Sequence, residues 1–251
     1  MKRLAFGLVV SACLITGNLV ARASEKDAAA IVDKAIAAMG GEEKLAKVKA
    51  ASWKAKGTLT FQDNETEFTT QVMMGGLDRY RSEFESEFNG NPFKAVTVLS
   101  GEKVWRKFGD QVRELEQSEV KNEQYNVRLQ LLPISLHMLK GKDYKLETAG
   151  EEKIADKEAM VVKVTAPGGR TFKICFDKQS SLPVKIVADI VGFRGDEFTQ
   201  ETYYTAYKEF DGIKRPSKYE SRRDGNKFIE FEVIEFKVLD KLPDSTFEAP
   251  K

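Results

Sequence analysis

An alternation of apolar and charged residues with a period of two runs through most of this chain and limits what it can fold into. After Ser52, apolar and small side chains from Trp53 to Phe61 alternate with lysines and threonines, and the pattern returns in 68–74 and 80–88. A strand of this kind presents one face to a core and the other to water, which is typical of an antiparallel sheet. Further predicted strands cover 95–99, 103–108, 112–115, 145–149, 159–166, 170–176, 184–191, 199–210, 214–222 and 227–238.

The last predicted strand changes phase within its own length. Up to Val233 its apolar residues are odd-numbered, whereas from Ile234 onward they are even-numbered. One extra residue in a strand shifts every later side chain to the other face, so the slip predicts a β-bulge or a strongly coiled strand. Before this strand, Asp224-Gly225 predicts a two-residue hairpin turn.

Two segments have helical instead of strand periodicity. Near the N-terminus, apolar residues recur at helical spacing and Gly40-Gly41 ends the segment. In the middle of the chain, a stripe with spacings of four, three and four interrupts the strands, and Pro133 falls inside it, which favours two short helices over one long helix. The two stripes consist of Ile31, Val32, Ala35, Ile36 and Met39, and of Val127, Leu131, Ile134 and Met138.

These elements predict an α+β protein that is mainly antiparallel β. Neither a linker nor a low-complexity segment nor a shift in composition separates the two halves of the strand pattern. We therefore expect one domain over 24–251, in which a curved sheet surrounds the N-terminal helix and the central helical insert.

The first 23 residues are typical of a secretory signal peptide. Lys2 and Arg3 precede an uncharged, mainly apolar stretch, and a small-x-small motif ends at Ala23. We expect cleavage after Ala23 and export, with the periplasm as the destination. Residues 10–13 also resemble a lipoprotein box with Cys13 as the lipidated residue, but the apolar stretch before it is short for such a signal.

The charge balance excludes some classes of function. The net charge of +1 belongs to the export segment, because residues 1–23 carry three basic side chains and no acidic one, which leaves 37 basic against 39 acidic residues. A nucleic-acid binder needs a basic surplus, so we expect no nucleic acid as a partner. One histidine and two cysteines argue against a metal site built on these residues, and we expect no metal and no cofactor.

Residue types that act as catalytic groups in other proteins have structural interpretations in this sequence. His137 lies inside the central helical stripe without an acidic residue three or four positions away, which favours a packing role over catalysis. The glutamates between 83 and 87 share a strand face with arginines and predict a solvated ladder of charges. Cys175 is the only cysteine after cleavage; we expect a shielded thiol, with an intermolecular disulfide or a reactive thiol as the alternatives. We expect no enzyme activity.

Three segments together resemble the LolA/LolB-like superfamily of exported, outer-membrane lipoprotein-sorting-like proteins. The first is Met39-Gly40-Gly41 with the strand that follows it, and the second is the strand–turn–strand of 176–186 with Leu182-Pro183. The third is 207–216, with its Asp-Gly-Ile and final proline, followed by the ending of 242–250. The resemblance lies in their order along most of the mature chain.

This resemblance implies an incomplete curved β-barrel wrapped around helices, with an apolar cavity between the sheet and the helices. In the founding members the cavity shields the acyl chains of lipoproteins that cross the periplasm, and other members bind different lipids or act as sensors. No residue here matches a catalytic or ligand-latching motif of the family, so none is transferred.

The large apolar side chains of the strands are the candidate ligand cavity. Taken alone, they favour an ordinary filled core, whereas the resemblance favours a cavity that the helices fill only in part. The candidates are Trp53, Phe61, Met74, Phe84, Trp105, Ile174 and Ile186, with Trp105 open to the outer face of the sheet as well. The stripe of Val127, Leu131, Ile134 and Met138 would form a lid helix.

The resulting hypothesis is an exported protein that binds a lipid or lipoprotein acyl chain in this cavity without covalent chemistry, as a carrier in lipoprotein sorting. An envelope protein partner and peripheral contact with a membrane fit this role. The alternative is an envelope sensor or protein-interaction module on the same scaffold, with a filled core.

Overall fold

A single curved antiparallel sheet dominates the structure, a computed structural model that describes residues 16–61, 64–88 and 90–251, with side chains from Ser24 onward except that of Phe61. In this part of the chain the sheet has 13 strands in the order β6-β5-β4-β3-β2-β1-β13-β12-β11-β10-β9-β8-β7. The strands are β1 (Ala50–Phe61), β2 (Asn64–Gly75), β3 (Arg79–Phe88), β4 (Asn91–Ser100), β5 (Lys103–Phe108), β6 (Gln111–Glu114), β7 (Lys145–Ile154), β8 (Lys157–Thr165), β9 (Thr171–Asp177), β10 (Pro183–Val191), β11 (Glu197–Phe210), β12 (Ile213–Arg223) and β13 (Asn226–Leu239). The helices are α1 (Thr16–Ala38), α2 (Glu42–Lys47) and α3 (Gln117–Ser135), with the 3-10 helices η1 (Leu136–Lys140) and η2 (Asp244–Phe247).

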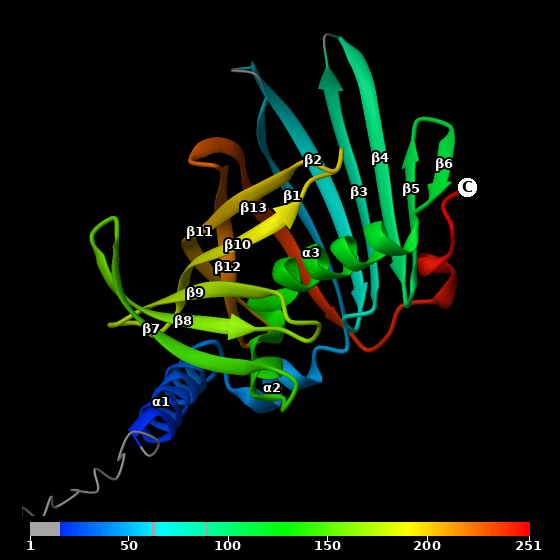
Figure 1. Cartoon of the computed structure of the whole chain (residues 1–251). Helices are drawn as coiled ribbons and strands as arrows, with labels where there is room; N and C mark the ends of the chain where they lie inside the picture. The colour runs from blue at the N-terminus through cyan, green and yellow to red at the C-terminus, as the bar shows by residue number, and fades with distance from the viewer. Residues whose placement is uncertain (1–15, 62–63, 89) are drawn as a thin grey trace, which may run out of the picture.

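The order of the strands explains why the barrel is incomplete. Most strands pair with their neighbours in sequence, and the pairing of β1 with β13 joins the two ends of the chain in the middle of the sheet. The edges are β6 and β7, which flank α3 in sequence. The sheet curls so that α3 lies across its concave side (Figure 1). The predicted fold class, a mainly antiparallel, unclosed curved barrel with helices, is therefore confirmed, and of the two helical segments predicted inside it, the N-terminal helix packs mainly on the edge strand β7.

The predicted bulge lies in β13 at the position of the phase change. Lys54 of β1 faces Glu235, while the next residue, Ala55, faces Val233, so Ile234 is the extra residue. The side chain of Ile234 is 48% exposed. Both the odd-numbered apolar residues before it and the even-numbered ones after it can then face the interior.

A glycine permits the close approach of β1 and β13 beyond this bulge. Gly57 pairs with Phe231, and a Cβ atom at Gly57 would lie 1.9 Å from the carbonyl oxygen of Glu230. That distance leaves no space for any side chain, so the contact requires glycine.

The N-terminal helix packs on β7 and ends at the two glycines that the sequence indicates. Its buried residues include Val32, Ile36 and the following Met39. Beyond the helix, the N–H of Lys214 donates to the carbonyl of Met39 at 3.0 Å, and Gly40, with φ of 120°, lies against the Gly212 carbonyl. The first and third segments of the family resemblance thus contact each other.

The predicted export segment falls largely outside the described residues. Residues 1–15, with Cys13, are not part of the description, so cleavage after Ala23 stays a prediction. The described chain contains no helix that combines the length and the apolarity needed to cross a bilayer. Ser24, the expected first mature residue, accepts a hydrogen bond from the N–H of Thr148 at 3.1 Å.

The central insert differs in one detail from its prediction. Instead of dividing at Pro133, α3 continues through it to Ser135, and a 3-10 helix follows. A proline in the last turn removes only one hydrogen bond of the helix, and the Ser135 hydroxyl returns a bond to the Leu131 carbonyl at 2.7 Å. The expected division between two short helices is therefore displaced by two residues.

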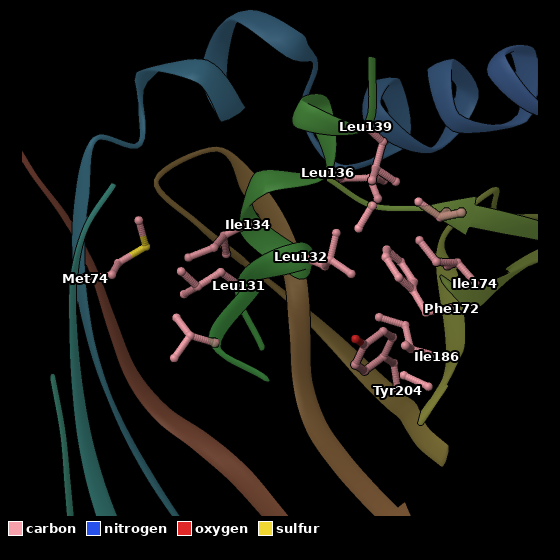
Figure 2. Close-up of a cluster of buried hydrophobic side chains, with 14 of the residues drawn as sticks. Met74, Leu131, Leu132, Ile134, Leu136, Leu139, Phe172, Ile174, Ile186 and Tyr204 are labelled. Carbon is pink, nitrogen blue, oxygen red and sulfur yellow. The ribbon is translucent and has the colours of Figure 1, made fainter. Parts of the chain in front are cut away.

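The core lies between the inner face of the sheet and these helices. Figure 2 shows side chains of α3 and η1 pointing toward residues of β9, β10 and β11 on one side and toward Met74 of β2 on the other. The helix thus lies between the two wings of the sheet, which are β2–β6 on one side of the central strands β1 and β13 and β7–β12 on the other.

Candidate ligand cavity

A cavity of about 330 Å³ lies between the concave face of the sheet and α3. Five strands of the two wings (β2, β3, β10, β11 and β12) and the two central strands, β1 and β13, contribute one wall, and α3 contributes Asn126, Leu129 and Gln130. The volume falls at the lower end of the range of small-molecule sites. The lining consists of Trp53, Phe68, Thr70, Val72, Tyr80, Ser82, Phe84, Asn126, Leu129, Gln130, Ile186, Ala188, Ile190, Gln200, Thr202, Tyr204, Arg215, Tyr219, Ser221, Arg223, Phe228, Ile229 and Phe231.

A row of phenylalanines extends the apolar surface from this cavity across the inner face of one wing. Phe68 stacks on Phe84 with ring centroids 5.0 Å apart, and Phe93 of β4 contacts Phe84 edge-on at 6.3 Å. Phe108 of β5 continues the row and meets Phe193 at 4.7 Å. Most of these rings are only half-buried, so they offer apolar area that a ligand can still cover.

Phe193 belongs to the connection between β10 and β11 and reaches across the opening of the sheet. Its side chain is 53% exposed, its carbonyl accepts a hydrogen bond from Arg106 of β5 at 3.4 Å, and its ring lies under the same guanidinium at 4.9 Å. Arg106 also forms an ion pair with Glu123 of α3 at 2.5 Å, and both side chains are only 11% exposed. Arg106 of β5 therefore contacts both the β10–β11 loop and α3.

The charges that line the cavity are of one sign. Its lining includes two arginines, Arg215 and Arg223, and no aspartate or glutamate. The hollow of about 850 Å³ on the outer face has the opposite balance, with six glutamates and two lysines in its lining. The interior is thus electropositive relative to the outer surface.

Arg215 is a buried cation that forms no ion pair with any residue in the described part of the chain. It is 3% exposed, and its guanidinium lies 4.3 Å from the ring centroid of Phe236 and 5.1 Å from that of Trp53. Its Nη2 donates to the Tyr219 hydroxyl at 3.2 Å and its Nε to the Pro216 carbonyl at 3.4 Å. Among the described residues, Nη1 has no hydrogen-bond partner. A buried charge without a counter-charge is costly, so it indicates a site for an anion.

Arg223 is in a different environment at the other end of the same strand face. It is half-buried, donates to the Gln200 side chain at 3.1 Å and lies 3.5 Å above the ring centroid of Phe228. Burial lowers the pKa of its guanidinium from 12.5 to about 10, which leaves it charged at neutral pH. Because it is partly exposed, water can solvate its charge.

The structure brings three of the seven candidate cavity residues together at this site. Trp53, Phe84 and Ile186 line the cavity from β1, β3 and β10. Met74 and Ile174 are buried in the core and do not line it. The side chain of Phe61, the last residue of β1, is outside the described part of the chain.

Trp105 lies on the other face of the sheet. Its partner across β4 is Val98, while the neighbouring pair of Leu99 and Val104 faces the core, so alternation places Trp105 outside. Its indole N–H donates to Glu114 at 3.1 Å. The strand pattern alone left both faces open for this residue.

The predicted lid residues fill the core. Val127, Leu131 and Ile134 are buried and do not line the cavity, and Met138 borders a second, small space of about 20 Å³. The α3 residues that line the main cavity, such as Leu129, lie outside the stripe. The periodicity identified the face that the helix buries, and the cavity occupies a different face.

Sequence reasoning missed the polar part of the lining. The inner face of β12 carries Arg215, Tyr219, Ser221 and Arg223, which alternate with exposed or outer-facing residues such as Lys218. From the sequence, the basic pairs Lys214-Arg215 and Arg222-Arg223 fit contacts with lipid head groups and solvated hairpin ends equally well, so neither pair was assigned to the cavity. The sequence signal for this polar lining is that Arg215 and Arg223 occupy odd-numbered positions of the strand, as Tyr219 does, and therefore share its face.

The other reactive side chains have structural environments. Cys175 is fully buried among small apolar residues of the outer face, and burial, together with the nearby Glu152 carboxylate, raises the pKa of its thiol to about 12. Burial lowers the pKa of His137. In the described part of the chain, no three histidine, cysteine or carboxylate residues are grouped as a metal site would require.

Solved structures share this fold at low sequence identity. A LolA superfamily protein from Nitrosomonas europaea superposes with a TM-score of 0.57 and 16% identity over 88% of this chain and 97% of that one. A domain named as an outer-membrane lipoprotein-sorting protein, from Vibrio parahaemolyticus, gives 0.58 and 11% over 89% and 97%. A DUF1329 family protein from Desulfovibrio piger gives 0.53 and 14% over 88% and 97%. No protein-family model and no curated protein matches the sequence. The chain has a LolA-like fold.

Proposed function

We propose that this protein binds the acyl chain of a lipid or lipoprotein in the cavity beside α3, without covalent chemistry, and carries it within the cell envelope. The observation that supports the proposal is a cavity whose half-buried phenylalanines continue to the opening of the sheet. Burial of each CH₂ group of a chain contributes about 0.8 kcal/mol, so a long chain binds usefully without a polar latch. The signal peptide of residues 1–23 would deliver the protein to the periplasm.

The contact of Phe193 with Phe108 and Arg106 would control access to the cavity. It joins the two wings at the opening of the sheet, and it involves one exposed loop residue. Displacement of this loop would open the row of phenylalanines without disturbing the buried face of α3. Access through the loop replaces the expected opening of the helix itself.

The proposal is tested by uptake of a fluorescent acyl-chain probe and by native mass spectrometry of protein purified gently from the periplasm. Ala188→Phe places a phenyl ring in the cavity, because Ala188 lines it, and should abolish uptake. Val187→Phe introduces the same ring at the neighbouring position of β10, which does not line the cavity, and is the matched control, which should bind like the unmodified protein. Equal binding by both variants, or absence of uptake by the unmodified protein, contradicts the carrier role and favours a protein-interaction module.

A further inference from the structure

We propose that the ligand of this cavity is an anionic amphiphile and that its acid group pairs with Arg215, so that the head group lies at the end of β12 remote from the β10–β11 loop and the chain points toward Phe193 at the opening. This inference rests on the proposed acyl-chain binding and goes beyond it by fixing the chemistry and the direction of the ligand.

The first argument is the state of Arg215 itself. Its guanidinium is buried, it lines the cavity, and its Nη1 has no acceptor among the described residues. Two aromatic rings and a tyrosine hydroxyl hold the side chain in place, so the donor is already oriented. A carboxylate or phosphate oxygen would supply the missing acceptor and the missing negative charge.

The second argument is the absence of competing acids in the lining. No aspartate or glutamate lines the cavity, so an incoming anion meets no repulsion there. The buried carboxylate of Glu123 on α3 is already paired with Arg106. Because the surroundings exclude water, an ion pair at Arg215 is stronger than one formed at the surface.

The third argument distinguishes the two arginines. Arg215 and Arg223 lie eight residues apart on one face of β12, about 26 Å along the strand at a rise of about 3.3 Å per residue. One acyl chain of a bilayer covers only half of the hydrocarbon thickness, about 15 Å, so one head group engages one arginine. Arg223 has Gln200 and the Phe228 ring as partners and is partly exposed, whereas Nη1 of Arg215 has no acceptor among the described residues. The geometry therefore favours Arg215.

The direction of the ligand is tested with the chain's own tryptophans. The sequence has two, and Trp105 lies on the outer face, so the variant Trp105→Phe leaves Trp53, beside Arg215, as the only reporter. Stearate that carries a nitroxide next to the carboxylate should quench Trp53 more strongly than stearate with the nitroxide at the methyl end. The reverse order, with both probes bound, overturns the inference while the proposed function stands. If neither probe binds, the proposed function fails.

The chemistry of the head group is tested with ligands of one chain length. Hexadecanoate and hexadecyl phosphate should bind the unmodified protein about 10- to 100-fold more tightly than hexadecanol, the range expected for a charge-assisted hydrogen bond. Preference for hexadecanoate would identify a fatty acid as the natural source, and preference for the phosphate would identify a phospholipid. Equal binding of acid and alcohol overturns the inference.

A pair of variants assigns this preference to one residue. Arg215→Met should reduce the preference for acid over alcohol to about one, and Arg215→Lys should keep part of it, since a lysine keeps the charge without the fork of donors. Arg222→Gln, on the opposite, exposed face of the same strand, is the matched control and should keep the full preference. An unchanged preference in Arg215→Met overturns the assignment. The quenching experiment needs no change at Arg215, so it still tests whether the acid group lies beside Arg215 if Arg215→Met does not fold.

Discussion

Neutralising one partner of the Arg106–Glu123 ion pair is predicted to lower the free energy of unfolding by several kcal/mol, although the side chain hardly changes in size. In Glu123→Gln the side chain keeps its size, but Arg106 loses its counter-charge while both positions remain 89% shielded from solvent. Breaking a buried ion pair by removing one partner costs about 3–5 kcal/mol. Because a little solvent reaches both side chains, we expect the lower end of that range, about 3 kcal/mol. For a domain of this size that lowers the Tm by about 6–12 °C.

The assay is denaturant unfolding of four proteins: the unmodified chain, Glu123→Gln, Arg106→Gln and the double variant. We expect the double variant to be less destabilised than the sum of the single variants, because removing both charges leaves neither unpaired. The control is Glu43→Gln, which removes a highly exposed ion pair with Lys47 and should change the free energy of unfolding by less than about 0.5 kcal/mol.

The result that would refute this reasoning is a Glu123→Gln variant no less stable than Glu43→Gln, or single-variant effects that simply add. Either result would mean that water solvates Arg106 well enough to replace its partner. Because Arg106 also holds Phe193, we expect Glu123→Gln to release a bound acyl probe faster than the unmodified protein does, which stopped-flow fluorescence can measure.

Three further experiments test the fold and the processing of the chain. Gly57→Ala should destabilise the protein by more than about 3 kcal/mol or prevent folding. Gly168→Ala, at a turn with open space around it, should cost about 1 kcal/mol. Unfolding curves that show the larger loss for Gly168→Ala contradict the contact assigned to Gly57. Cys175 should resist alkylation at pH 8 in the native protein and react after denaturation. Since its pKa is raised from 9.0 to about 12 by burial, the stability it contributes is present below pH 9 and declines as the pH rises toward 12; fast native alkylation, seen by mass spectrometry, would be inconsistent with this. Sequencing the exported protein should begin at Ser24, and a blocked N-terminus at Cys13 would refute the cleavage prediction.

Local sequence patterns predicted much of the architecture. Alternation identified the strands because a strand has a period of two whatever it packs against. The phase change at Val233 and Ile234 located the bulge to the residue, since one extra residue moves all later side chains to the other face. The stripe of α3 correctly separated its buried face from the rest, although Pro133 did not end the helix where the pattern suggested.

The cavity depends on relations that no local pattern contains. Alternation assigns Trp105 and Trp53 to faces of their own strands, but only the curvature of the whole sheet decides which face is concave. In the same way, Arg215 has the sequence neighbours of a solvated hairpin, and it is buried because the paired strands β1 and β13 place Trp53 and Phe236 against it. The sequence by itself determined where strands, turns and helices lie, since those follow from interactions between near neighbours. Tertiary structure decided which side chains the space encloses and which charge is left without a partner, because both follow from how distant strands curve toward each other.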